Sequence, residues 1–255
     1  IIHKDAKTDL CFTNENADRM KSGEITWLLN DKTAFATTWY QNVDTEGSRN
    51  DYPVLDSNSK PVYYDGKKYT NEPSGTIFEL SGKGRRNDPF LISSTADWDK
   101  LAKFCNGGNK SAGMYFLQTA DFDLKGDSLT SISTFSGNYD GGGHTIRNAY
   151  IDGDGVVGPF GVVNGDGTVT RLCVENSTIK YLKEGMRAGG IAARLTDNGV
   201  ISNCLVKGCK GENNGRSGVV GGIVADMFDQ SAIRNCLVVK TTLSATRTGY
   251  ICGDT

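Results

Sequence analysis

Two pairs of aspartates in this sequence have a spacing that could support acid–base chemistry. Asp121 and Asp123 flank Phe122, so on a strand their carboxylates would point to the same side. Asp152 and Asp154 lie in a glycine-rich stretch, where aspartate more commonly caps a turn. A glycosidase needs two carboxylates about 5 to 9.5 Å apart across a groove. Because the chain also has only two histidines, we expect no catalytic residues.

Three arginines could bind an acidic ligand, because each stands two residues before a glycine ahead of an apolar phrase. They occur in Arg187-Ala188-Gly189, Arg216-Ser217-Gly218 and Arg247-Thr248-Gly249. If these segments stack in register, the guanidinium groups form a stripe that could hold sulfates or carboxylates of a glycan bidentately. The alternative is three solvated loop arginines that pair with nearby carboxylates, for which the candidates are Glu184, Glu212 and Asp226.

A second candidate binding surface is aromatic. Trp39, Tyr40, Tyr63 and Tyr64 lie close together in the first quarter of the chain and could form a platform on which sugar rings stack. The alternative is that these rings build the core of a small module, which is the more common use of such residues.

Metal and cofactor chemistry has little support. The stretch Asp152–Gly155 begins like a calcium-binding EF-hand loop, but it lacks the third ligand and the closing glutamate. The seven cysteines are odd in number and form no CxxC pair, so a zinc site is not expected. We therefore predict no metal and no cofactor.

Apart from the aromatic residues, these candidates lie in a part of the chain that contains a repeated unit. Measured at Ala149, Cys173, Cys204 and Cys236, one phrase returns after 24, 31 and 32 residues. A second phrase keeps step with the first: Gly158-Pro159-Phe160-Gly161, Gly189-Gly190-Ile191-Ala192 and Gly221-Gly222-Ile223-Val224. Two phrases that recur in the same order indicate one structural unit copied along the chain.

The repeats favour a parallel β-helix. Short apolar runs alternate with Asn-Gly and Asp-Gly turns, which argues against the helical repeats of similar length. Only 37% of the residues are hydrophobic, which suits a thin solenoid with two or three strands per repeat. We expect Ala149, Cys173, Cys204 and Cys236 to form an inward ladder, with Asn148, Asn203 and Asn235 stacked beside them. Stacked cysteines lie within disulfide range but rarely reach the required torsion, so we expect reduced thiols.

The predicted fold is mainly β: a right-handed parallel β-helix over residues 73–255 with an N-terminal capping helix, preceded by a small α/β module over residues 1–72. Ser94 and Thr95 offer N-caps for a helix from Ala96 to Cys105, which would cover the open edge of the first coil. In the first module we predict a helix from Ala17 to Leu29 and short strands.

Several phrases of residues 75–255 carry a resemblance to a known family. The phrase Gly158–Gly161 is similar to Gly-Leu-Phe-Gly, and Asn87–Ile92 is similar to an opening Asp-Pro-Tyr-Leu-Ile. The segment Phe135–Ile146 is close to Phe-Ser-Gly-Thr-Phe-Asp-Gly-Asn-Gly-His-Thr-Ile. These phrases resemble the GLUG-repeat family of bacterial cell-surface and adhesin-like proteins. The right hand of the coil follows from this resemblance and from the general bias of parallel crossovers.

The resemblance implies a non-enzymatic segment of an extracellular protein, at the bacterial cell surface (outer-membrane associated) or secreted. Partners would be host or bacterial glycans or surface proteins, and the segment would be covalently continuous with further repeats. The formal net charge of −2 gives no footprint for nucleic acid, and no apolar run is long enough to insert in a membrane. The alternative function is a carbohydrate-active β-helix enzyme, either a polysaccharide lyase or a glycoside hydrolase.

Overall fold

A computed structural model describes residues 17–30, 39–44, 49–56, 58–64, 68–71, 79–153, 155–181, 186–212 and 217–254. The chain divides into two compact units, Ile1–Ile77 and Phe78–Thr255. The sequence predicts this boundary at residue 72. Each unit is described by itself below.

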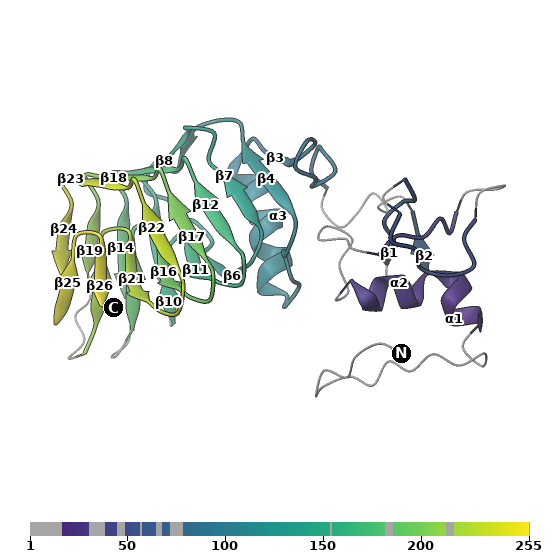
Figure 1. Ribbon diagram of the computed structural model, residues 1–255. Helices are drawn as coiled ribbons and strands as arrows, with labels where there is room; N and C mark the ends of the chain where they lie inside the picture. The colour runs from purple at the N-terminus through teal and green to yellow at the C-terminus, as the bar shows by residue number, and fades with distance from the viewer. Residues whose placement is uncertain are drawn as a thin grey trace. The chain divides into compact units, whose positions relative to one another are not determined.

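The first unit contains two short helices and a hairpin (Figure 1). Helix α1 spans Ala17–Ser22 and α2 spans Glu24–Leu29, so the single helix predicted over this stretch is wrong. The break lies at Gly23, whose φ of 94° is in the left-handed region that glycine tolerates. Strands β1 (Tyr63–Tyr64) and β2 (Tyr69–Thr70) pair antiparallel.

The second unit is a parallel β-solenoid, which confirms the predicted mainly-β fold class. Its strands form five parallel sheets, each named here by its first strand, and each full coil supplies one strand to every sheet (Figure 1). The β3 sheet contains β3 (Phe90–Ile92), β4 (Tyr115–Gln118), β7 (Asn138–Asp140), β12 (Thr168–Thr170), β17 (Val200–Ser202) and β22 (Ala232–Arg234). The β5 sheet contains β5 (Phe122–Asp123), β8 (Thr145–Arg147), β13 (Cys173–Glu175), β18 (Leu205–Lys207) and β23 (Leu237–Val239).

The remaining three sheets complete each coil. The β9 sheet contains β9 (Tyr150–Gly153), β14 (Thr178–Tyr181), β19 (Lys210–Glu212) and β24 (Thr242–Ser244). The β10 sheet contains β10 (Val156–Val157), β15 (Arg187–Gly189), β20 (Val219–Gly221) and β25 (Arg247–Gly249). The β6 sheet contains β6 (Ile132–Phe135), β11 (Phe160–Val163), β16 (Ala192–Leu195), β21 (Val224–Met227) and β26 (Cys252–Asp254). The coil therefore has five strands, not the two or three expected from the phrases.

The register of the coils corrects the predicted ladder. Cys173 pairs with Leu205, so the neighbour of Cys204 in the preceding coil is Leu172, and its neighbour in the next coil is Cys236. The repeat phrases that contain Cys173 and Cys204 are therefore offset by one residue. The inward valines Val174, Val206 and Val238 stack on one another and set the register. Ala149 belongs to another corner, beside Ser177, Cys209 and Thr241.

Left-handed residues form two of the corners, in separate columns. One column holds Gly143, Arg171, Asn203 and Asn235, and the other holds Asn148, Asn176, Gly208 and Lys240. Every one of these residues has φ between 49° and 81°. Asn148 therefore does not stack beside Asn203 and Asn235, as predicted. Asparagine and glycine are favoured at these corners because they adopt positive φ at low cost.

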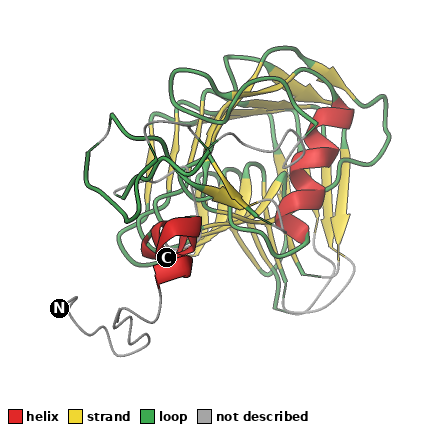
Figure 2. Cartoon of the chain, turned by 90° about the vertical axis from the view of Figure 1, so that its right-hand side faces the viewer, coloured by secondary structure: helices red, strands yellow, loops and turns green. Residues whose placement is uncertain are grey.

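Helix α3 (Thr95–Asn106) covers the N-terminal end of the coils, as predicted (Figures 1 and 2). The Ser94 side chain accepts a hydrogen bond from the Asp97 backbone N–H, and the Asp97 carboxylate in turn accepts one from the Ser93 backbone N–H. Trp98 of α3 is fully buried and packs edge-on against Tyr139 and Phe160, with ring centroids 5.7 and 5.4 Å away. The helix end is thus tied to the first coils by aromatic packing.

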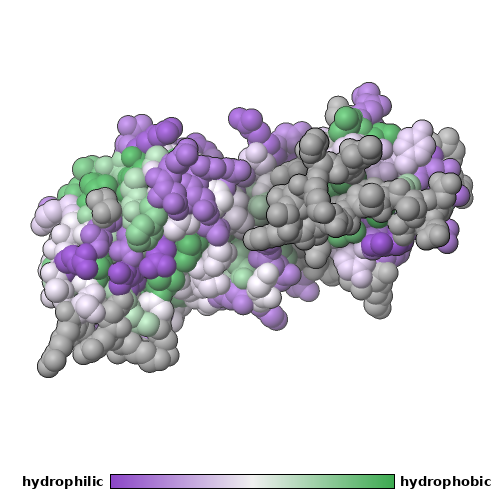
Figure 3. Space-filling view, turned by 60° about the horizontal axis from the view of Figure 1, so that its bottom comes forward, coloured by the Kyte–Doolittle hydropathy of each residue, from purple (hydrophilic) through white to green (hydrophobic). Residues whose placement is uncertain are grey.

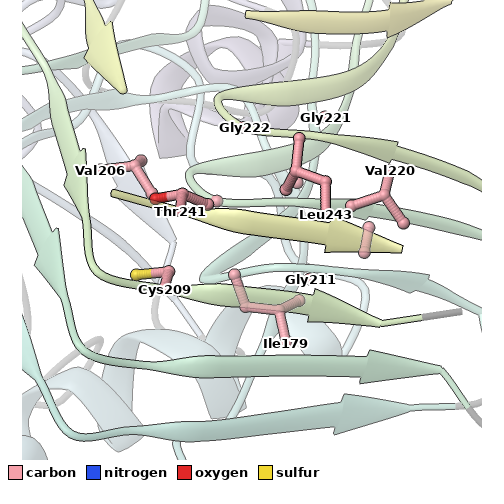
Figure 4. Close-up of a pocket in the computed structure, with 12 residues that line it drawn as sticks. Ile179, Val206, Cys209, Gly211, Val220, Gly221, Gly222, Thr241 and Leu243 are labelled. Carbon is pink, nitrogen blue, oxygen red and sulfur yellow. The ribbon is translucent and has the colours of Figure 1, made fainter. Parts of the chain in front are cut away.

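The interior contains a small void of about 10 Å³ between the β9 sheet, at β14, β19 and β24, and the β10 sheet, at β15 and β20 (Figure 4). Gly211 lines this void and stands in register between Ile179 and Leu243, so this coil lacks the large side chain that its neighbours supply. Val220 takes up part of the space, where the preceding coil has Ala188. Large and small residues therefore exchange places between these coils, with Ile179 and Ala188 in one and Gly211 and Val220 in the next.

This exchange predicts strong coupling between Gly211 and Val220. A Cβ at residue 211 would lie 2.6 Å from Val220 Cγ1, so Gly211→Ile alone overpacks the coil and is expected to cost about 1–3 kcal/mol. Val220→Ala alone enlarges the void and is expected to cost about 2 kcal/mol. The double variant reproduces the packing of the preceding coil, so urea denaturation should give a stability near that of the parent chain. A double variant as unstable as the sum of both changes would contradict this packing scheme.

Candidate functional site

The register of the described strands does not place the three arginines of the predicted stripe in one column. Arg187 of β15 pairs in register with Val219 of β20, and Val219 pairs with Arg247 of β25. The three strands are 32 and 28 residues apart, whereas Arg216 follows Arg187 by only 29 residues. Arg216 lies outside the described residues, and a valine occupies the position between the two arginines.

Arg187 and Arg247, the two described arginines in the register column of Val219, are both paired with carboxylates. Arg187 Nε lies 2.5 Å from Asp226 Oδ2, and Arg194 Nη2 lies 3.3 Å from the same oxygen. Asp226 is only 1% exposed although it points outward from β21, because the two arginines cover it. Arg247 forms an ion pair with Asp254. The alternative expectation, that these arginines pair with nearby carboxylates, is therefore confirmed for Arg187 and Asp226, whereas Glu184 lies outside the described residues.

The aromatic residues of the first unit are placed differently from one another. Trp39 and Tyr40 are half-buried; the backbone of Trp39 is held by the Asn30 side chain, whose Nδ2 lies 2.7 Å from the Trp39 carbonyl oxygen. Tyr63 is buried at 1% exposure, so its ring belongs to the core of the unit. Tyr64 is 38% exposed, and its ring stacks on Tyr69 at a centroid distance of 4.7 Å. The exposed Tyr64 ring is therefore paired with the half-buried Tyr69 ring.

The carboxylate pair on β5 is occupied by structural hydrogen bonds. Asp121 accepts one from the Thr145 backbone N–H at 3.0 Å and also pairs with His144 and Arg147. The Asp123 carboxylate accepts a hydrogen bond from the Asn148 amide at 2.8 Å. These donors hold the pKa of both carboxyl groups below the usual range, with the Thr145 N–H acting most strongly on Asp121 and the Asn148 amide on Asp123. A glycosidase acid needs a raised pKa, so this pair is unsuited to that role. In the other pair, Asp152 is exposed on β9, and Asp154 lies outside the described residues.

The lowered pKa values predict a loss of stability in acid. An unfolded aspartate has a pKa of about 3.9, so each depressed group stabilises the fold fully above that value. This contribution is lost as the pH falls through the lower folded pKa, because protonation breaks the hydrogen bonds. Urea midpoints should therefore drop between about pH 5 and about pH 3, and the drop should be smaller in Asp121→Asn. The exposed Asp99 makes no side-chain hydrogen bond to the described part of α3 and its surroundings, so Asp99→Asn is the control. Equal acid sensitivity in Asp121→Asn and the parent chain would contradict the assignment.

A polar hollow of about 420 Å³ lies on the outer surface of the solenoid, where the first three coils turn into the β9 sheet. Its walls come from the loop after β5 and from the corners before β9 and β14. The lining residues are Lys125, Gly126, Asn148, Ala149, Tyr150, Asn176 and Thr178. The set contains an ammonium, a phenol, two amides and a hydroxyl, but no carboxylate.

The hollow follows from the corners themselves. Lys125, Asn148 and Asn176 all have positive φ, between 49° and 54°, which turns the chain sharply at each coil. Tyr150 and Thr178 begin the strands that follow, and they pair in register. Sequence reasoning missed these residues as a site. The signal was present, because Asn148-Ala149-Tyr150 and Asn176-Ser177-Thr178 occupy the same position in successive repeats.

The outer surface in the view of Figure 3 carries separate hydrophilic and hydrophobic areas. Within the described ranges, no three histidine, cysteine, aspartate or glutamate side chains lie close enough together to hold a metal ion. No described helix is both long and apolar enough to cross a membrane.

Comparison with known proteins gives one related sequence and one related structure. The sequence is 27% identical to Halomucin of Haloquadratum walsbyi over 173 residues, an alignment that covers 60% of this chain and 2% of Halomucin. A crystal structure of a candidate immunoglobulin A1 protease from Bacteroides ovatus matches 69% of this chain and 68% of its own, with 18% identity and a TM-score of 0.47. A structural match at this level carries no argument about function. No model of a known protein family matches the sequence, so the GLUG resemblance stays a prediction.

Proposed function

We propose that this chain is a non-enzymatic segment of a cell-surface protein, in which the solenoid presents its outer surface to glycan or protein partners. The observation that carries the proposal is the polar hollow at Lys125 and Tyr150, which has hydrogen-bonding groups but no carboxylate in its lining. Such a surface can hold a sugar but lacks the acid and base that would cleave it. The likeness to Halomucin supports a cell-surface setting.

The repeat supports the same proposal. Its recurring residues are the inward valines and the left-handed corners, both of which build the coil. Recognition is therefore left to outward positions that differ from coil to coil, such as Tyr150, Thr178 and Lys210 in one register column. Covalent continuity with further repeats and association with an outer membrane are parts of this proposal that rest on the GLUG resemblance.

The test is a glycan array probed with the full 255-residue chain, followed by an assay for reducing sugars on every glycan that binds. Binding without release of reducing ends or unsaturated products is the expected result. Turnover of a bound glycan would overturn the non-enzymatic proposal in favour of a polysaccharide lyase or glycoside hydrolase. If the chain binds none of the glycans, the proposal of glycan partners is wrong and only protein partners remain.

A further inference from the structure

The hollow brings together four side chains whose polar groups are unused within the fold. Lys125, Tyr150, Asn176 and Thr178 are among its lining residues, and none of them makes a hydrogen bond through its side chain to the described part of the chain. Asn148 differs, because its amide donates to Asp123 at 2.8 Å. The hollow therefore presents donors and acceptors that a ligand can satisfy without breaking contacts of the fold.

The chemistry of these groups matches the hydroxyl groups of a pyranose ring. Lys125 and the Asn176 amide can supply donors, and the two hydroxyl groups can act either way. Tyr150 adds a ring that can pack against the apolar face of a sugar. The hollow is open to solvent rather than enclosed, which suits a single ring of a glycan chain that lies on the surface.

The local charge favours a neutral sugar. Lys125 is the single charged residue of the lining, and its backbone N–H donates to the Asp123 carboxylate at 3.1 Å. That neighbouring carboxylate offsets the ammonium, so the hollow has little net attraction for an acidic sugar.

We propose that the hollow formed by Lys125, Tyr150, Asn176 and Thr178 is a subsite for a pyranose ring of a neutral glycan. This inference rests on the proposed glycan-binding function and assigns its location and ligand class. Tyr150 and Thr178 are held in register by the β9 sheet, and Lys125 and Asn176 lie on turns with positive φ.

The repeat provides a matched control for each test variant. Lys240 has the same left-handed conformation as Lys125, with φ of 50° against 53°. Thr242 stands in the column of Thr178 two coils later, outside the hollow. Asn176→Gly keeps its corner intact, because Gly208 holds the same position with φ of 64° in the next coil. The exposed Tyr250 is the control for Tyr150.

The experiment measures binding of the neutral oligosaccharide with the strongest array signal, chosen from gluco-, manno- and N-acetylglucosamine oligomers, by calorimetry on the full chain. Tyr150→Ala should weaken the Kd at least tenfold, and Lys125→Gln, Asn176→Gly and Thr178→Val by about threefold to tenfold each. The controls Tyr250→Ala, Lys240→Gln and Thr242→Val should stay within twofold. Circular dichroism melting checks that every variant remains folded.

Three results would overturn the assignment. If the parent chain binds a neutral oligosaccharide and the hollow variants bind it equally well, the subsite is wrong while the glycan-binding function stands. If the strongest ligand is an acidic oligosaccharide such as oligogalacturonate, the neutral class is wrong. If the parent chain binds no glycan, the proposed glycan function fails and this inference fails with it.

Discussion

Replacement of Trp98 by alanine is expected to destabilise the solenoid by about 3–5 kcal/mol and to cause self-association. The indole is fully buried, its Nε1–H donates to the Thr130 carbonyl at 2.8 Å, and its ring packs on Tyr139 and Phe160. Alanine is a better helix former than tryptophan, so the decrease in the free energy of unfolding comes from lost contacts between α3 and the coils. Loosening of α3 exposes strand edges at the end of the stack, and such edges pair with other chains.

Urea denaturation and light scattering after gel filtration measure both effects of Trp98→Ala. The matched control is Lys103→Ala, an exposed position on the same helix, which should change stability by less than about 0.5 kcal/mol. A Trp98→Ala variant that elutes like the parent chain and loses less than about 1 kcal/mol would show that α3 does not cap the stack.

The capping helix was predictable because its determinants are local. The Ser94 hydroxyl caps the Asp97 backbone N–H, the Asp97 carboxylate accepts from the Ser93 backbone N–H, and the buried face of α3 has ordinary helical spacing. The register of the coils was harder to predict, because the cysteines are the most conspicuous recurring residues but the inward valines set the pairing. An alignment of the repeats that matches Cys173 with Cys204 is therefore one residue out of register. A further error of the same kind places Ala149 at the corner of these cysteines, although it belongs to another corner.

The arginine column and the polar hollow could not be predicted from the sequence, because both depend on the length of each coil and on contacts between coils. Arg187 and Arg216 share a local motif, but a coil of 32 residues brings Val219 beside Arg187. The carboxylate that covers Arg187 comes from another sheet of the next coil, 39 residues further along. The hollow likewise needs three consecutive coils to form, so no single repeat contains its four polar groups.

Replacement of Asp226 by alanine is expected to destabilise the solenoid by about 3 kcal/mol, because it leaves Arg187 and Arg194 without their shared carboxylate. The side chains of Arg187 and Arg194 are 24% and 37% exposed, so solvent relieves part of the cost and the expected value lies at the low end for a buried pair. Asp254 stands in register with Asp226 one coil later, but its ion pair with Arg247 is exposed. Asp254→Ala is therefore the matched control and should cost less than about 1 kcal/mol in urea denaturation.

The same pair of variants decides whether the arginine column is a binding surface or a structural network. If Asp226 neutralises the arginines, the parent chain should bind a sulfated oligosaccharide weakly, and the folded fraction of Asp226→Ala should bind it about tenfold more tightly at low salt. Asp254→Ala should give a smaller gain, because Arg247 already exchanges with solvent. Strong binding of the sulfated oligosaccharide by the parent chain, unchanged in Asp226→Ala, would instead restore the arginines as an acidic-glycan site. The comparison separates the two roles because the carboxylate contributes to stability in both cases but opposes anion binding only in the first.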